Sequence, residues 1–167
     1  SNALSNLSAL LRRTGEFTEA LGYARQAVLV NPVSAVALVN LGNAEKDSGN
    51  LESAVTTYRR AISAQPDSAL AHWNLALSLL SKGDVSEGFE EMAWRWKWND
   101  FPGIRRKFPQ PNWNGENLKG KKVLLHPEQG LGDTIHFMRY APMVKQLADY
   151  VYLELPSAIV PLAQNVP

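Results

Sequence analysis

The stretch from Asn40 to Asn50 reads NLGNAEKDSGN, and its framework recurs 34 residues away in both directions. Residues 6–16 read NLSALLRRTGE, and residues 74–84 read NLALSLLSKGD. Each copy opens with Asn-Leu and a small residue and reaches a glycine nine positions after the asparagine. Two more columns keep the same spacing: Ala20, Ala54 and Gly88 in one, and Pro32 and Pro66 in the other. A period shared by independent columns indicates a repeated supersecondary unit.

Each copy predicts two helices joined by a tight turn. The glycine column falls where a first helix should end, because glycine adopts the left-handed turn at little steric cost. Asn50 and Asp84 then stand at the N-cap of a second helix, and Glu87 follows Asp84 in capping-box spacing. The second helices carry apolar residues at helical spacing, namely Phe17, Leu21, Ala24 and Val28 in one copy and Leu51, Val55, Tyr58 and Ile62 in the next. Proline ends the unit because it cannot continue a helix.

This helix-turn-helix of 34 residues resembles the tetratricopeptide repeat family over residues 1–100. The repeats run over residues 1–34, 35–68 and 69–102. The resemblance implies a mainly α fold class, in which residues 1–100 form a helical-hairpin solenoid.

The two ends of the repeat region depart from the pattern. In the third copy Arg95 replaces the small residue of Ala27 and Ala61, and Asp100 replaces the proline, so we expect the solenoid to end there. Ser1-Asn2-Ala3 resembles the remainder of a removed tag, so no part of the predicted fold rests on it. Repeats upstream in a longer parent protein are compatible with this start.

One polar column should line a groove, because first helices build most of the concave face of such solenoids. Asn6, Asn40 and Asn74 form this column. An amide offers a donor and an acceptor, so a ladder of amides can bind the backbone of an extended peptide. The column resembles the asparagine ladder in the repeats of O-linked N-acetylglucosamine transferases. The alternative is that each Asn bonds its own or a neighbouring helix. The groove should also include Val36, Asn43, Trp73 and Leu77, with Val39, Lys46 and Leu70 nearby.

Three indoles follow the repeats in Ala93-Trp94-Arg95-Trp96-Lys97-Trp98. On a helix, Trp94 and Trp98 would share one face and Trp96 would point nearly opposite. We expect one face to cover the end of the solenoid. Alternation with Arg and Lys also permits stacking on single-stranded nucleic acid, but the basic stretch is short and no nucleic-acid fold is visible.

Residues 101–120 predict a linker and residues 121–167 a separate α/β segment. We expect strands at Lys122–His126 and Tyr150–Glu154, a helix over Thr134–Leu147 kinked at Pro142, and a further helix from Ser157 to Ala163. This order is typical of the start of a parallel sheet. Two parallel strands leave apolar faces uncovered. We therefore expect four residues to pack on the solenoid or on a second copy in a homodimer: Val123, Leu125, Val151 and Leu153.

The loop between strand and helix contains Gly130-Leu131-Gly132, which could bring backbone N–H groups to a phosphate. The third glycine of a dinucleotide fingerprint and the lysine of a P-loop are both missing. The wider string EQGLGDTI at 128–135, with RYAP at 139–142 and FPQP-x-W-x-G at 108–115, resembles the opening of a glycosyltransferase-like domain found behind tetratricopeptide repeats in bacterial proteins. It is also similar to the Gly-Asp start of heptosyltransferases.

The resemblance implies that residues 121–167 are an incomplete Rossmann-like piece of a GT-B enzyme, with Asp133 as general base on the acceptor hydroxyl. The residues themselves favour Asp133 as a helix N-cap, a role compatible with the first. In that family the nucleotide sugar binds chiefly to a second domain. We therefore do not expect this chain alone to transfer a sugar; that activity belongs to a complete parent protein.

Composition excludes several classes. The chain has 167 residues and no cysteine, so a disulfide scaffold and thiolate metal sites are ruled out. No apolar window suits a membrane span, and no signal peptide is visible. The spacing of His126, Glu128 and His136 matches no familiar metal site, so we expect no metal and no cofactor. We interpret the basic stretch 95–122, with eight Lys/Arg and two Asp/Glu, as a solvated linker.

Three functions remain as hypotheses. The first, which we favour, is a cytoplasmic scaffold whose groove binds a protein or an extended peptide. The second is a glycosyltransferase fragment whose repeats present a protein acceptor. The third, least favoured, is a binder of single-stranded nucleic acid.

Overall fold

The computed structural model of the chain describes residues 2–101, 106 and 108–164. The chain divides into two compact units, Ser1–Phe101 and Pro102–Pro167. The fold is mainly helical with a small two-stranded sheet, which confirms the predicted fold class. The expected linker over 101–120 lies partly outside the described residues.

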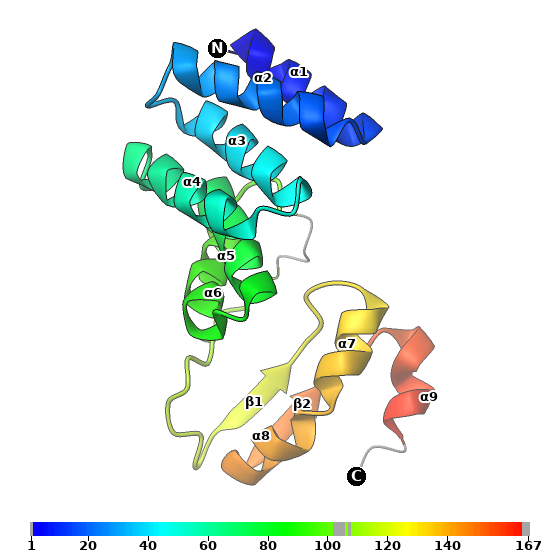
Figure 1. Cartoon of the computed structure of the whole chain (residues 1–167). Coiled ribbons are helices and arrows are strands. Elements are labelled where there is room, and N and C mark those ends of the chain that lie inside the picture. The colour runs from blue at the N-terminus through cyan, green and yellow to red at the C-terminus, as the bar shows by residue number, and fades with distance from the viewer. Residues whose placement is uncertain (1, 102–105, 107, 165–167) are drawn as a thin grey trace. The chain divides into compact units, whose positions relative to one another are not determined.

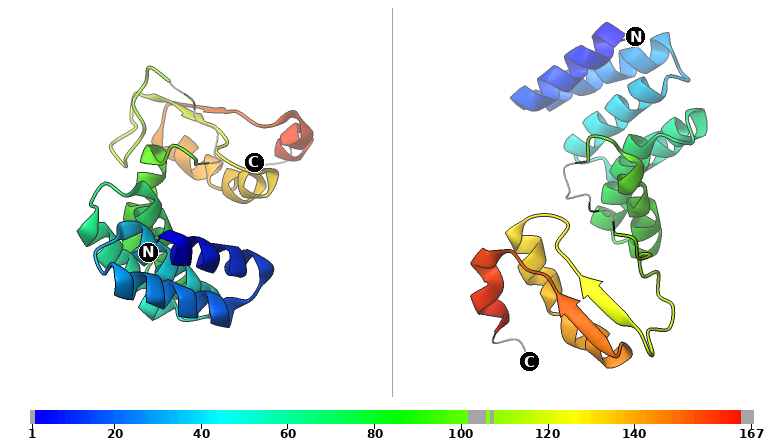
Figure 2. Two further views of the ribbon diagram at one scale, coloured as in Figure 1. Left: turned by 90° about the horizontal axis from the view of Figure 1, so that it is seen from above. Right: turned by 180° about the vertical axis from the view of Figure 1, so that it is seen from behind.

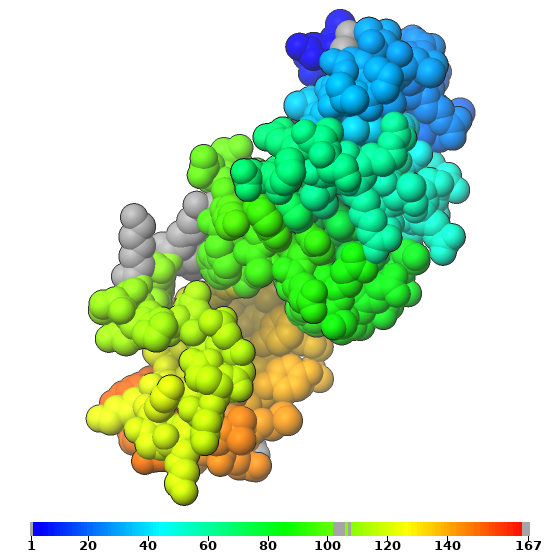
Figure 3. Space-filling model, turned by 90° about the vertical axis from the view of Figure 1, so that its left-hand side faces the viewer, coloured from blue at the N-terminus to red at the C-terminus, as the bar shows by residue number. Residues whose placement is uncertain are grey.

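The first unit is a stack of helical hairpins (Figure 1). Its helices are α1 (Asn2–Thr14), α2 (Phe17–Val30), α3 (Ala35–Asp47), α4 (Leu51–Ala64), α5 (Ala69–Lys82) and α6 (Val85–Met92). Each odd-numbered helix packs on the even-numbered helix that follows it, and α3 also contacts α1 and α5. Figure 3 shows successive hairpins as bands that run from blue to green. Of the expected tag remainder, Asn2 and Ala3 belong to α1, and Ser1 lies outside the described residues.

The glycine column ends the first helices as predicted. Gly15, Gly49 and Gly83 have φ angles of 87°, 82° and 92°. In each turn the residue after the glycine donates its N–H back to the helix, for example from Asn50 to the Glu45 carbonyl at 2.9 Å. This bond satisfies a carbonyl that the last helical turn leaves without a partner.

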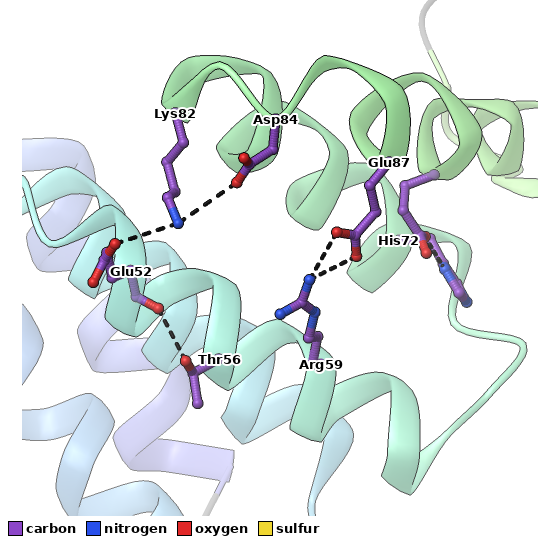
Figure 4. A network of polar contacts seen from close by, with 8 residues as sticks. Glu52, Thr56, Arg59, His72, Lys82, Asp84 and Glu87 are labelled. Atoms are coloured by element: carbon purple, nitrogen blue, oxygen red, sulfur yellow. Dashed lines mark hydrogen bonds and ion pairs between the residues drawn. The ribbon is translucent and has the colours of Figure 1, made fainter.

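The side-chain caps were predicted wrongly. Asn50 and Asp84 do stand at the N-caps of α4 and α6, but neither side chain accepts a capping hydrogen bond. Glu87 instead accepts two hydrogen bonds from Arg59 Nη2, at 2.7 and 2.8 Å (Figure 4). Lys82 lies between the carboxylates of Glu52 and Asp84, at 3.4 and 3.6 Å. Glu87 therefore joins α6 to α4 instead of capping its own helix.

Small residues let the helices approach closely. Ala20 and Ala54 have no exposed surface, and a Cβ on Gly42 would lie 2.5 Å from the Tyr58 ring. A Cβ on Gly88 would likewise lie 2.8 Å from the side chain of Leu80. The small-residue columns of the repeat are therefore contact points between helices, as their position predicts.

The tryptophan segment closes the first unit, but not as an α-helix. Ala93–Lys97 forms a 3₁₀ helix, η1, which packs on α5 and α6. Trp94 stacks on His72, whereas Trp96 and Trp98 both pack against Phe101. The predicted pairing of Trp94 with Trp98 is therefore wrong, because a 3₁₀ helix has three residues per turn. Cover for the end of the solenoid was predicted correctly.

The second unit holds β1 (Lys122–Leu125), α7 (Leu131–Met138), α8 (Ala141–Leu147), β2 (Tyr150–Leu153), η2 (Ser157–Ile159) and α9 (Val160–Ala163). The strands are parallel and pair Lys122 with Tyr150 through Leu125 with Leu153 (Figure 2). The helix predicted over Thr134–Leu147 begins earlier and is two helices, with Pro142 in the first turn of α8. Proline is tolerated in the first turn because no hydrogen bond within the helix uses an N–H group at that position.

The two faces of the small sheet differ in exposure. Val123, Leu125 and Val151 are half-buried, and β2 packs on α8. On the opposite face Leu124, Tyr150 and Tyr152 are exposed. The uncovered apolar face is therefore mainly the one that the sequence analysis did not name, although Leu153 is also exposed. Among the helices described, none is long and apolar enough to cross a bilayer.

Candidate functional site

The asparagine column lies on α1, α3 and α5, which are the first helices of successive hairpins. Asn6 is exposed, Asn40 is half-buried, and Asn74 is only 8% exposed. Because α3 contacts both α1 and α5, the three positions follow one another along a row of neighbouring helices. The column is more enclosed at its α5 end than at its α1 end.

The three amides form no side-chain hydrogen bond to any described residue. Ser78 Oγ donates a hydrogen bond to Asn74 at 2.9 Å, but its acceptor is the backbone carbonyl of Asn74 and not the side chain. In the described part of the chain, the amides therefore do not bond their own or a neighbouring helix, which was the alternative interpretation. The amides of Asn6 and Asn40 remain open to water or to a ligand, whereas the Asn74 amide is largely enclosed.

Asn43 differs from the other predicted groove residues, because its amide has an internal partner. Its Oδ1 accepts a hydrogen bond from the Tyr58 hydroxyl at 2.7 Å. Burial raises the pKa of the Tyr58 phenol; the neighbouring charge of Arg12 opposes this, and those of Asp47 and Glu45 add to it. The hydroxyl therefore stays protonated and fixes Asn43 across the α3–α4 hairpin.

The apolar residues predicted beside the column have different surroundings. Val36 is 62% exposed and Leu77 is half-buried, so both remain accessible. Trp73 lies against the segment that ends the unit, with ring centroids 6.3 Å from Trp98 and 5.3 Å from Phe101. Val39, expected near the groove, belongs instead to the buried core.

A stacked aromatic site at the end of the unit was not predicted in detail. The imidazole of His72 lies 3.8 Å from the Trp94 ring, with the planes 1° apart, and Lys97 Nζ lies 3.7 Å from the Trp94 ring centre. His72 also contacts the Glu91 carboxylate through Nδ1 and the Pro66 carbonyl through Nε2, the latter at 2.9 Å. His72 and Trp94 sit 22 residues apart, and helical periodicity carries no signal for such a stack.

A polar depression on α3 and α4 was also missed by the sequence analysis. It is shallow and open to solvent, has a volume of about 320 Å³, and is lined by Glu45, Glu52, Ser53, Thr56 and Thr57. The Thr57 hydroxyl donates to the buried Glu45 carboxylate at 2.7 Å. A polar residue at an inward helical position is the signal that could have revealed this pair.

In the second unit, Gly130 is the N-cap of α7 and Gly132 lies inside its first turn. Asp133 is the third residue of α7 and is exposed, so its expected role as the N-cap is wrong. The hydroxyl of Thr134 donates to the Gly130 carbonyl at 3.0 Å and helps to close this turn. A carboxylate in a first helical turn is favoured by the helix dipole.

The histidines of the second unit have separate partners. His126 packs against Phe108 at 5.1 Å between ring centroids, and His136 Nδ1 accepts a hydrogen bond from Arg139 Nη2 at 3.1 Å. Within the described ranges, no three His, Asp or Glu side chains come together as a metal site.

Comparison with known proteins identifies the repeats. Residues 42–83 match a family model described as TPR repeat, and residues 1–31 match one described as tetratricopeptide repeat. Protein FlbA of Caulobacter vibrioides is 35% identical over 81 residues, which is 48% of this chain and 14% of FlbA. The chain therefore matches only a small part of that relative's length.

Solved structures share the fold at low identity. The type III secretion translocator chaperone SycD of Yersinia enterocolitica has a TM-score of 0.55 at 16% identity, over 60% of this chain and 70% of its own. MamA has a TM-score of 0.53 at 23% identity, over 57% of this chain and 56% of its own. The second TPR of Spaghetti (RPAP3), bound to the HSP90 peptide SRMEEVD, has a TM-score of 0.53 at 13% identity, over 55% of this chain and 85% of its own. Residues 1–31 and 42–83 thus match tetratricopeptide repeats, and the helical unit shares the fold of these structures.

Proposed function

We propose that the first unit binds an extended protein segment along the exposed faces of α1, α3 and α5. The observation that carries this proposal is the column of Asn6, Asn40 and Asn74, whose amides recur on three successive first helices without a hydrogen-bond partner in the described structure. Each amide can pair with one peptide group, so the column binds backbone without selecting side chains. The Spaghetti repeat, whose structure contains a peptide, supports this use of the fold.

Side chains beside the column would add selectivity. Val36 is exposed next to Asn40 on α3, and Leu77 is half-buried next to Asn74 on α5. Apolar side chains of the bound segment gain free energy by covering such residues. Trp73 is engaged by Trp98 and Phe101, so it would contribute only its remaining surface.

The proposal is tested with an array of extended peptides and fluorescence titration of the best binder. The double variant Asn40→Ala plus Asn74→Ala should weaken binding about thirtyfold, since two hydrogen bonds contribute about 2 kcal/mol. Gln26→Ala removes an exposed amide from α2, outside the column, and serves as the matched control. Equal affinities of the double variant and the parent chain would refute the proposal.

The same double variant separates binding from structure. If the two amides supported the fold, alanine would lower the unfolding free energy. We expect no loss, because neither amide has an internal partner and alanine is the better helix former. A destabilised double variant would return the column to a structural role.

For the second unit we propose the beginning of an α/β domain that belongs, in a longer protein, to a glycosyltransferase. The parallel pairing of β1 with β2 across α7 and α8, together with the exposed Asp133 carboxylate, supports this. A nucleotide sugar would be the partner of the complete enzyme only. Transfer by that longer protein should be lost in Asp133→Asn, whereas Asp149→Asn is the control outside α7.

The exposed sheet face requires cover in either setting. We propose that, in this chain, a second copy supplies it and forms a homodimer. Sedimentation should then show a dimer that Leu124→Lys dissociates, because Leu124 is exposed opposite Tyr152, on the sheet face that also carries Tyr150. A monomer at all concentrations would contradict the dimer.

The nucleic-acid hypothesis receives less support. Trp94 is stacked between His72 and Lys97, and Trp98 packs on Trp73 and Phe101. Rings engaged in this way are poor platforms for bases. Absence of binding to single strands at low salt would remove this function.

A further inference from the structure

The α1 helix carries the residues of an interior helix. Ala3, Leu7 and Leu11 occupy the same repeat columns as Ala71, Leu75 and Leu79 of α5, and the residue types are identical. In α5 these three side chains are at most 1% exposed. Leu75 and Leu79 pack with Val55 and Tyr58 of α4, the second helix of the preceding hairpin.

In α1 the same columns are open. Leu7 is 37% exposed, Ala3 is exposed, and Leu11 is half-buried. The α3 helix agrees with α5, because Ala37 and Leu41 in the corresponding columns are 0% and 6% exposed. The difference therefore arises from what covers each helix and not from the residues themselves.

We propose that α1 is a docking face for the second helix of a further hairpin of the same repeat. The established α4–α5 interface supplies the argument, because α1 presents the three residues that α5 uses there. In α5 the residues of these columns pack on a second helix. We therefore expect them to bind a second helix in α1 as well, and not another copy of α1.

The structure also specifies the chemistry of the incoming hairpin. Leu10 stands in the column of Ala44 and Ser78, which are fully buried, so the incoming helix must leave room for a larger side chain. Its first helix should carry an acidic residue. In the first unit Arg12 pairs with Asp47 of the next first helix at 2.7 Å, and Arg13 now stands in the column of Asp47. Arg13 is exposed and has no partner among the described residues.

The test extends the full chain with a copy of its own second repeat in which Lys46→Glu supplies the acidic residue opposite Arg13, and Leu10→Ser in α1 restores the small residue of the α4–α5 interface. Residues 35–68 joined in front of residue 1 keep the 34-residue period, because Ser68 then precedes Ser1 as it precedes Ala69. Circular dichroism should show a single transition with Tm raised by at least about 4 °C, since each interface adds to the stability of a repeat array. Hydrogen exchange of the α1 amides should slow in the extended chain.

Three variants make the result specific. In the extended chain, Leu7→Lys should abolish the gain in Tm. In the unextended chain, Leu7→Lys should change Tm little, whereas Leu75→Lys, in the same column, should unfold the unit. The proposal is overturned if the added repeat melts separately, or if the gain persists with Leu7→Lys. A dimer of the unextended chain that Leu7→Lys dissociates would also overturn it, because a second copy would then cover α1.

Discussion

Two buried serines of α1 show how one hydrogen bond changes the contribution of a hydroxyl group to the stability of the fold. Ser8 donates to the Ala20 carbonyl at 2.8 Å across the α1–α2 contact. Ser5 is only 1% exposed, and its hydroxyl has no partner in the described structure. A buried polar group without a partner costs about 1–3 kcal/mol, whereas a satisfied one stabilises by about 1 kcal/mol.

The first prediction follows from this difference. Ser5→Ala should raise the unfolding free energy by about 1 kcal/mol, because it removes an unsatisfied hydroxyl and adds helix propensity. Ser8→Ala should lower it by about 1 kcal/mol. Urea denaturation measures both values. A loss of stability in Ser5→Ala would mean that its hydroxyl is satisfied in solution.

The second prediction concerns Tyr58 and alkaline pH. Burial raises the pKa of its phenol, so the folded state retains the proton when the unfolded state loses it. This contribution to stability is complete below the unfolded pKa of about 10 and falls as the pH rises above it. Tyr58→Phe should cost about 1 kcal/mol at neutral pH, because Asn43 Oδ1 loses its donor.

The same variant should show a weaker loss of stability at alkaline pH than the parent chain. Urea denaturation of both proteins at neutral pH and above the ordinary tyrosine pKa provides the measurement. Parallel alkaline losses in the two proteins would show that another group titrates.

At the scale of elements, the closing segment stabilises the end of the repeats through one phenylalanine. Phe101 is 6% exposed and packs with Trp73, Trp96 and Trp98. Phe101→Ala should destabilise the first unit by about 3 kcal/mol, because it leaves a cavity among three indoles. Phe108→Ala, at a 40% exposed ring of the second unit, is the control. Tryptophan fluorescence during denaturation reports the change, and equal effects of the two variants would contradict this role.

Helix positions were predictable where a repeated residue imposes a conformation. Gly15, Gly49 and Gly83 each adopt a left-handed turn. Because this turn recurs three times at one spacing, the positions of the helical hairpins could be predicted. The caps failed because Glu87 has a stronger partner in Arg59, which is distant in sequence. The prediction for the tryptophan segment was wrong for the same reason. The conformation of η1 depends on its packing against α5, which the spacing of the tryptophans does not reveal.

The positions of the asparagines in the candidate site could be predicted from the sequence, but the contacts of the residues around them could not. The spacing of Asn6, Asn40 and Asn74 placed them on successive first helices. That Asn43 is held by Tyr58, or that Phe101 packs on Trp73, depends on contacts between segments with no shared pattern. In the second unit, strand alternation did not reveal which sheet face the helices cover.

At the scale of the molecule, the first unit holds its own core. The two buried clusters draw only on residues between Leu4 and Leu79, and the aromatic closure ends at Phe101. Because repeat stability is a sum of local terms and neighbour interfaces, we expect residues 1–101 to form this unit by themselves.

The last prediction compares two shortened chains. Residues 1–101 should fold alone, with the Tm of the first unit in the whole chain. Residues 1–92 keep all six helices but lack Trp94 and Phe101, so His72 and Trp73 lose their stacking partners. This shorter chain should melt lower by at least about 8 °C, because burial of two aromatic side chains contributes more than about 2 kcal/mol. Circular dichroism measures both transitions. Identical Tm values would show that α6 alone closes the array, and an unfolded 1–101 chain would show that the first unit depends on the second.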